Sequence, residues 1–252
     1  SWKKKWSARA ALVLLSFIAF IALGMPDGLL VIAWPSVRAN FSIPLDALGM
    51  LLIAATAGYL SSSFSSGYLI SRLGVGGVLV ASCAITGTAL IGYTLVPEWW
   101  MMVALGVFAG LGAGAIDAGL NTYIAANFGE GLMQWLHASY GIGVTLGPII
   151  MTTAINSFTS WQLGYHVVGF FQLALAACFV FTLPLWKQKT DHSPAKAEQK
   201  LTDYKTPFLE TLRQPRVWLS VTLFFLYVGS EVSLGSWAYT FLSESRLIPS
   251  TT

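Results

Sequence analysis

The chain has 252 residues, of which 55% are hydrophobic and only 10% are charged, and its formal net charge is +3. Its mean hydropathy is +0.67. Because soluble domains carry about 25% charged residues, this composition excludes an ordinary soluble protein and indicates a membrane protein. Nothing in the sequence resembles an RNA- or DNA-binding module, so no nucleic-acid partner is expected and the lipid bilayer is.

Seven apolar runs each approach the roughly 20 residues that a helix needs to cross about 30 Å of hydrocarbon. None alternates with a period of two, which argues against the strands of a membrane barrel. The first run is too long for the hydrophobic region of a signal peptide, so we predict a retained helix. The predicted spans are 10–33, 48–70, 75–96, 99–126, 134–158, 164–186 and 216–242.

The lysines and arginines gather on one side of the predicted spans. Sorted by the span ends that they flank, all but Arg38 and Arg246 lie on the same side as the N-terminus. Cytoplasmic loops carry the excess of Lys and Arg in membrane proteins. We therefore predict that the N-terminus is cytoplasmic.

The spans divide unevenly along the chain. Residues 1–186 hold six spans and form a predicted N-terminal bundle, residues 187–215 are polar with mixed charges, and residues 216–252 hold one further span. We interpret the polar segment as a cytosolic linker between two bundles. A seventh span without partners predicts that the rest of a second bundle lies further along the same chain or on a partner chain.

A short internal repeat surrounds acidic residues in the first and fourth spans. ALGMPDGLL (22–30) aligns with GAGAIDAGL (112–120), which places Asp27 on Asp117, and Glu231 in the seventh span is a weaker third echo. Lone acids thus recur in every third span. Many secondary transporters are built from such repeats, with binding sites near the midplane of the membrane. The pattern predicts that spans one, four and seven line one cavity.

The three acids, Asp27, Asp117 and Glu231, are predicted to couple transport to protons. An acid at the centre of a spanning helix costs about 2.5 to 3.5 kcal/mol on insertion scales, so it should face water or a partner group rather than lipid. A carboxylate that alternates between wet and dry surroundings can take up and release a proton. The alternative is a structural carboxylate that is hydrogen-bonded to a neighbouring helix.

Five other side chains in the spans are candidates for contact with a substrate. Asn121 lies four residues after Asp117 and shares its helix face, although an interhelical hydrogen bond would explain it equally well. His137 could bind a polar ligand or relay a proton, or simply mark the end of a span. The candidates are Asn121, Gln134, His137, Tyr227 and Trp237.

Glycines at regular spacing predict close helix packing. Gly106, Gly110 and Gly114 stack along one face of the fourth span, and Gly143 and Gly147 precede a proline in the fifth. The glycines do not form a nucleotide-binding fingerprint, which needs a preceding strand and a third glycine at the right offset. The H-E-x-x-H and Walker A motifs and the signatures of intramembrane aspartyl proteases are absent too. We therefore predict no catalytic residue, metal or cofactor, and no enzyme.

These features together resemble the major facilitator superfamily, whose fold is two six-helix bundles around a cavity lined by helices 1, 4, 7 and 10. GYLISRLGVGG (67–77) is similar to the superfamily's G-x-L-x-D-R-x-G-R-R motif, although Ser71 replaces the acid and glycines replace the last basic pair. The usual charged latch of that loop is therefore not expected. The matching residues of this cytosolic loop motif are Gly67, Leu69, Arg72 and Gly74.

Within the superfamily the sequence looks most like the fucose permease group of proton-coupled sugar symporters, which has an acid on helix 1 and an acid followed by Asn on helix 4. YVGSEVSLGSW (227–237) also looks like that group's helix 7. The resemblance implies an all-α membrane protein with one six-helix bundle of two three-helix repeats plus the first helix of a second bundle. It implies symport of protons with a sugar or similar small polar solute by alternating access, in a multi-pass protein of a bacterial-type inner membrane.

Two other functions remain open from the sequence. A proton-coupled antiporter that exports amphipathic compounds would use the same acids equally well. A receptor or accessory membrane protein that binds without transporting is the third reading, because seven spans cannot form the pair of bundles that alternating access needs.

Overall fold

The structure, a computed structural model, describes residues 2–186 and 213–242. The chain divides into two compact units, Ser1–Lys187 and Gln188–Thr252, and each is considered by itself. Seven helices in the described residues are long and apolar enough to cross a membrane, and the described elements are all helical, which confirms the all-α membrane fold. Most of the predicted linker lies outside the described residues.

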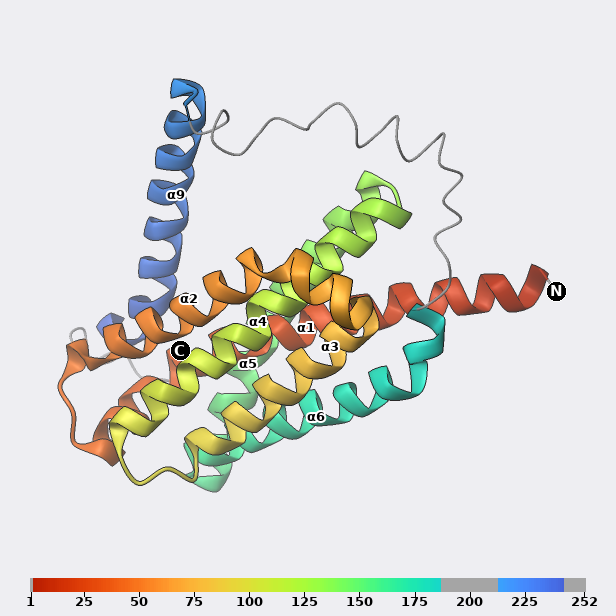
Figure 1. The fold of residues 1–252 in the computed structure, drawn as a ribbon. Coiled ribbons are helices and arrows are strands. Elements are labelled where there is room, and N and C mark those ends of the chain that lie inside the picture. The colour runs from red at the N-terminus through yellow and green to blue at the C-terminus, as the bar shows by residue number, and fades with distance from the viewer. Residues whose placement is uncertain (1, 187–212, 243–252) are drawn as a thin grey trace. The chain divides into compact units, whose positions relative to one another are not determined.

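The helices follow the predicted spans closely. The largest differences are in the first three helices: the first is longer at both ends than predicted, the second ends at Phe64 rather than at residue 70, and the third begins at Ser66 rather than at residue 75. The first unit contains α1 (Trp2–Phe41), a 3-10 turn η1 (Leu45–Ala47), α2 (Leu48–Phe64), α3 (Ser66–Tyr93), α4 (Trp99–Asn127), α5 (Glu130–Phe158) and α6 (Trp161–Trp186), as Figure 1 shows. The second unit contains α9 (Pro215–Thr240).

Glycines bring two pairs of helices into backbone contact, α1 with α5 and α2 with α4. A Cβ at Gly110 of α4 would lie 1.9 Å from the carbonyl oxygen of Ala55 in α2, and one at Gly143 of α5 would lie 2.0 Å from that of Ile21 in α1. These distances leave room for hydrogen only. The glycine spacing therefore produces the close packing that it predicted, and it fixes which helices are neighbours.

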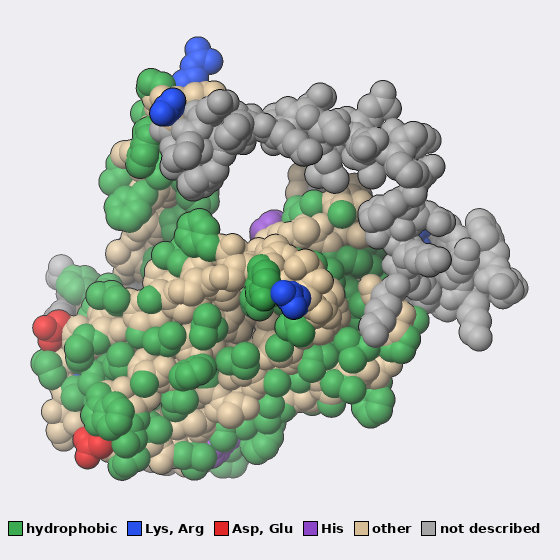
Figure 2. Space-filling model, in the orientation of Figure 1, with side chains coloured by type: hydrophobic (Ala, Val, Ile, Leu, Met, Phe, Trp, Pro, Cys, Tyr) green, Lys and Arg blue, Asp and Glu red, His purple; other side chains and the backbone are tan. Residues whose placement is uncertain are grey.

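The surface of the first unit is apolar, as a lipid-facing surface must be. Phe181 and Phe64 have 84% and 82% of their surface exposed, whereas Trp34 and Tyr165 are buried in the interior. Figure 2 shows hydrophobic side chains spread over the visible face of the bundle, with few charged ones among them. Large exposed phenylalanines would be costly in water and are favourable in hydrocarbon.

The chain turns at Gly74, within the segment predicted to be a loop between two spans. Gly74 has φ 69° and ψ 166° and interrupts α3, which is helical on both sides of it. This backbone region is essentially restricted to glycine. The loop motif is thus a helical segment with one sharp break, and Gly74 supplies the break.

Replacing Gly74 by Ala should lower stability because the new side chain strains the backbone, by about 1 to 3 kcal/mol. No neighbouring atom lies within 4 Å of a Cβ built there, so the cost is conformational and not steric. Thermal unfolding of the full-length protein in detergent would measure it. Gly67→Ala, which is equally uncrowded and has no positive φ, is the matched control. Equal midpoints for both variants would contradict this account.

A proline frees one carbonyl group in the middle of α1. Pro26 has no N–H and cannot bond the carbonyl of Ala22, four residues earlier. Gln172 of α6 donates to that oxygen instead, through Nε2 at 2.8 Å. The glutamine is only 2% exposed. In lipid every such carbonyl needs a partner, so this amide satisfies the group left by the proline one residue before Asp27.

Candidate functional site

Asp117 lies in a small hydrogen-bonded cluster between α4 and α2. Its Oδ2 accepts a hydrogen bond from the hydroxyl of Tyr59, and its Oδ1 accepts one from Nδ2 of Asn121 at 2.8 Å. The second bond follows from the four-residue spacing, which places both side chains on one face of the helix. The Oδ1 of Asn121 is buried and has no partner within the described residues. One polar acceptor therefore remains available beside the acid.

Asp27 is held in a similar way between α1 and α5. Its Oδ2 accepts a hydrogen bond of 2.6 Å from the hydroxyl of Tyr140. The residue is exposed, and it lies near the centre of the apolar span Arg9–Phe41. An exposed carboxylate at that depth cannot face hydrocarbon without a large cost. The side of the bundle that carries Asp27 must therefore meet water or protein.

The two acid clusters lie within electrostatic reach of each other. Tyr140 interacts with both Asp27 and Asp117, and Tyr59 likewise interacts with both acids. The first and fourth spans thus bring their acids to one region of the bundle. That spans one, four and seven line one cavity stays a prediction.

The two candidates on α5 are both exposed. The ring of His137 packs edge-on against Phe20 of α1, with centroids 5.9 Å apart, and it lies one turn before Tyr140. Gln134 lies a further turn away, toward the start of α5. His137 is therefore adjacent to the Asp27 cluster along the helix.

The remaining candidates belong to α9 in the second unit. The side chain of Tyr227 interacts with that of Glu231, one turn further along the helix. Trp237 is half-buried. Their assignment to a common site with Asp27 and Asp117 stays a prediction.

The loop motif residues lie apart from these clusters. Arg72 stacks over the ring of Tyr68 at 5.3 Å. With Gly74 it lines a crevice of about 310 Å³ that Leu183 and Trp186 of α6 close from the other side. Gly67 and Leu69 belong to the helical stretch that precedes the turn. The motif therefore shapes the contact between α3 and α6.

Tyr59 and Tyr140 were not among the predicted site residues, although Tyr59 donates a hydrogen bond to Asp117 and Tyr140 donates one to Asp27. A signal was present, since Tyr59 ends the tripeptide A-G-Y and Tyr140 ends A-S-Y, each in the second helix of a repeat. Tyrosines in membrane proteins are concentrated at the interfaces. That these two tyrosines lie beside intramembrane acids is evident only once the helix pairs are known.

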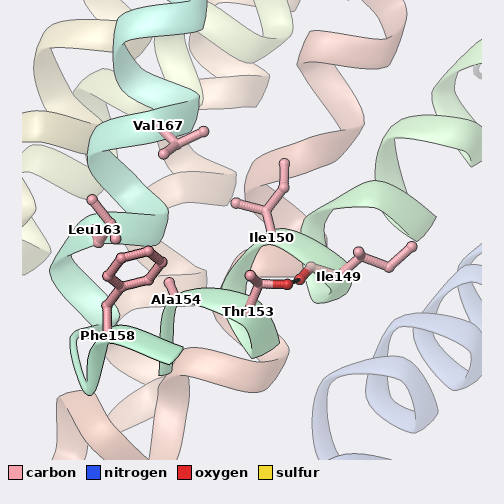
Figure 3. Close-up of a pocket in the computed structure, with 7 residues that line it drawn as sticks. All are labelled: Ile149, Ile150, Thr153, Ala154, Phe158, Leu163 and Val167. Carbon is pink, nitrogen blue, oxygen red and sulfur yellow. Dashed lines mark hydrogen bonds between the residues drawn. The ribbon is translucent and has the colours of Figure 1, made fainter. Parts of the chain in front are cut away.

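A second crevice, of about 240 Å³, lies between α5 and α6 (Figure 3). None of its lining residues is a predicted site residue. Its polar side chain, Thr153, uses its hydroxyl to bond the carbonyl of Ile149 at 2.7 Å. The crevice suits a hydrocarbon chain rather than a polar solute. Its lining residues are Ile149, Ile150, Thr153, Ala154, Phe158, Leu163 and Val167.

Comparison with known proteins gives one family match. The family model described as Major Facilitator Superfamily matches residues 12–248. Similar proteins include the bypass of stop codon protein 6 of Saccharomyces cerevisiae, 23% identical over 93% of this chain and 51% of that protein. The human sodium-dependent glucose transporter 1 is 23% identical over 88% of this chain and 48% of its own length. The glucose/mannose transporter GlcP of Bacillus subtilis is 20% identical over 80% and 51%.

This chain spans about half the length of these curated relatives. Two of the three are sugar transporters by name, and the superfamily resemblance drawn from the residues is confirmed by the family match.

Proposed function

Since the chain belongs to the major facilitator superfamily, we propose that it forms part of a secondary transporter that carries a sugar or similar small polar solute together with protons. The proposed transporter works by alternating access, and a second bundle on the same chain or on a partner completes it. The N-terminus lies in the cytoplasm, and the membrane is of the bacterial inner-membrane type.

The observation that carries this proposal is the exposure of Asp27 within a membrane-spanning helix. An acid is retained at such a position despite its cost when it serves an ion or substrate path. The unpartnered Oδ1 of Asn121 supports the same proposal, because a buried acceptor without a partner can receive a hydroxyl group of a solute. The names of the glucose transporters among the relatives agree with a sugar.

The groups around the acids favour a proton over a sodium ion as the coupling ion. A hard cation is bound by several oxygen atoms that turn their lone pairs toward it. Tyr59 and Asn121 instead turn O–H and N–H donors toward Asp117. Donors of this kind stabilise a carboxylate in its charged form, and a proton can neutralise that charge without a set of oxygen ligands.

Uptake by the full-length protein in liposomes tests the proposal. Labelled hexoses, supplied one at a time, should accumulate inside when the outer solution is more acidic, and a protonophore should abolish the accumulation. A sodium gradient alone should give none.

Other outcomes identify other functions. Accumulation under a sodium gradient alone would replace the proton as coupling ion. Release of amphipathic compounds in exchange for protons would establish the antiporter, and hexose binding without uptake would establish the receptor. Each of these results would overturn the symport proposal.

A further inference from the structure

Asp27 belongs to an arrangement of three residues: a glycine and the acid in one helix and a tyrosine of the neighbouring helix. Gly24 lies three residues before the acid, and a Cβ at Gly24 would lie 2.4 Å from the main-chain oxygen of Tyr140. The hydroxyl of the same tyrosine donates to Asp27 at 2.6 Å. Gly24 thus lets α1 pack directly against the main chain of Tyr140. The side chain of Tyr140 then reaches Asp27, about one turn after Gly24 in α1.

The same arrangement recurs between α4 and α2. Gly114, which the internal repeat aligns with Gly24, lies three residues before Asp117. A Cβ at Gly114 would lie 2.2 Å from the main-chain oxygen of Tyr59. The hydroxyl of Tyr59 donates to Asp117. Each acid is therefore held by a tyrosine that a glycine contact places beside it.

The two copies are related by the repeat itself. The first helix of each three-helix repeat packs against the second helix of the other repeat, α1 against α5 and α4 against α2. The two tyrosines occupy corresponding places, because A-G-Y (57–59) and A-S-Y (138–140) lie in those second helices. An accidental hydrogen bond would not recur with the same glycine, the same spacing and the same residue type.

The copies differ in the number of donors at the acid. Asp117 also accepts from Asn121, four residues later. The position four residues after Asp27 is Val31, which has no donor in its side chain. Within the described residues, Tyr140 is therefore the hydrogen-bond donor on which Asp27 depends, whereas Asp117 has two donors.

Within the described residues, tyrosines of the neighbouring helices are titratable groups that lie within electrostatic reach of the two acids. Those that interact with Asp27 are Tyr59 of α2, Tyr93 of α3, Tyr140 of α5 and Tyr165 of α6, and those that interact with Asp117 are Tyr59 and Tyr140. His137 lies one turn from Tyr140 on the same helix. Among the tyrosines of this set in the described residues, Tyr59 and Tyr140 are the ones that hydrogen-bond an acid.

We propose that Tyr59 and Tyr140 are positioning residues for proton coupling, each holding one aspartate in its charged form and releasing its hold when that aspartate takes up a proton. This inference rests on the proposed function. Each phenol keeps its own proton throughout. The proton comes from water and adds to the carboxylate, and the bond from the phenol then weakens because its acceptor is no longer charged. Proton uptake thereby loosens α1 from α5, or α4 from α2.

The test is the pH dependence of hexose uptake by full-length protein in liposomes carrying Tyr140→Phe or Tyr59→Phe. Losing a donor to the charged carboxylate favours its neutral form, so the pH of half-maximal uptake should rise, by about one unit for Tyr140→Phe. The rise should be smaller for Tyr59→Phe, since Asn121 remains as a donor to Asp117. Tyr123→Phe is the matched control, because Tyr123 packs against Trp186 and Phe128 and should leave the profile unchanged.

A second readout does not depend on transport. The infrared C=O band of protonated carboxyl groups reports their titration in the full-length protein. The midpoint of that titration should lie at higher pH in Tyr140→Phe, and Asp27→Asn should remove the component whose midpoint shifts. Unchanged titrations in both tyrosine variants would overturn the role of the tyrosines even if wild-type uptake is driven by protons. A wild type that fails to respond to a pH gradient would overturn the proposed function, and the infrared titration would still decide whether the tyrosines hold the acids.

Discussion

Asp117→Asn is expected to abolish the accumulation of hexose driven by a pH gradient, so that the ratio of inside to outside concentration falls to about one. An amide of nearly the same size cannot take up a proton, and a solute without coupling free energy from an ion cannot be concentrated. The variant keeps an oxygen acceptor for the hydroxyl of Tyr59, so the α2–α4 contact should persist. Exchange of labelled for unlabelled hexose across the liposome membrane should therefore remain measurable.

Asp46→Asn is the matched control for this loss of charge. Asp46 is exposed in the short turn before α2, outside the acid clusters. Its replacement should leave both accumulation and exchange intact. If Asp117→Asn accumulated hexose as well as the control does, Asp117 would not couple transport to protons.

Gly143→Ala is expected to have a large effect on stability. The new Cβ would lie 2.0 Å from the carbonyl oxygen of Ile21 and 3.1 Å from the Cα of Gly24, so one main chain must move away from another. Overpacking usually costs about 1 to 3 kcal/mol, and a clash between two main chains should reach the upper end of that range. A lower thermal unfolding midpoint and a lower yield of monodisperse full-length protein in detergent would show it.

Gly141 provides a control two residues away in the same helix. No atom lies within 4 Å of a Cβ built there. Gly141→Ala should be neutral or slightly stabilising, because alanine favours a helix over glycine by about 0.5 to 1 kcal/mol. Equal midpoints for the two variants would mean that α1 and α5 are not packed through Gly143.

The sequence predicts the helices and their close contacts because both depend on local patterns. An apolar run of fixed length defines each span, and glycines four residues apart define a packing face wherever the partner helix lies. Gly106, Gly110 and Gly114 accordingly contact α2 in the structure. The glycine pattern does not identify the partner helix, because helix pairing depends on contacts between residues far apart in the chain.

The acid site was predicted only in part for the same reason. The repeat singles out Asp27 and Asp117 from one short alignment, and the cost of a carboxylate within a membrane span favours a functional role for them. Tyr59 lies 58 residues before Asp117 and Tyr140 lies 113 residues after Asp27. A tyrosine in a span carries no sign of its partner until helix packing brings the two together, so the hydroxyl donors could not be assigned.

The hydrogen bond from the amide of Gln172 links α6 to the middle of α1. In a regular helix each carbonyl accepts a hydrogen bond from an N–H group of the same helix, so bending the helix strains hydrogen bonds within that helix alone. At Ala22 the bond crosses to another helix. If α1 bends at Pro26, either α6 moves with it or the carbonyl of Ala22 loses its hydrogen bond from Gln172. The part of α1 that carries Asp27 is thereby tethered to a helix that carries none of the proposed proton or substrate groups.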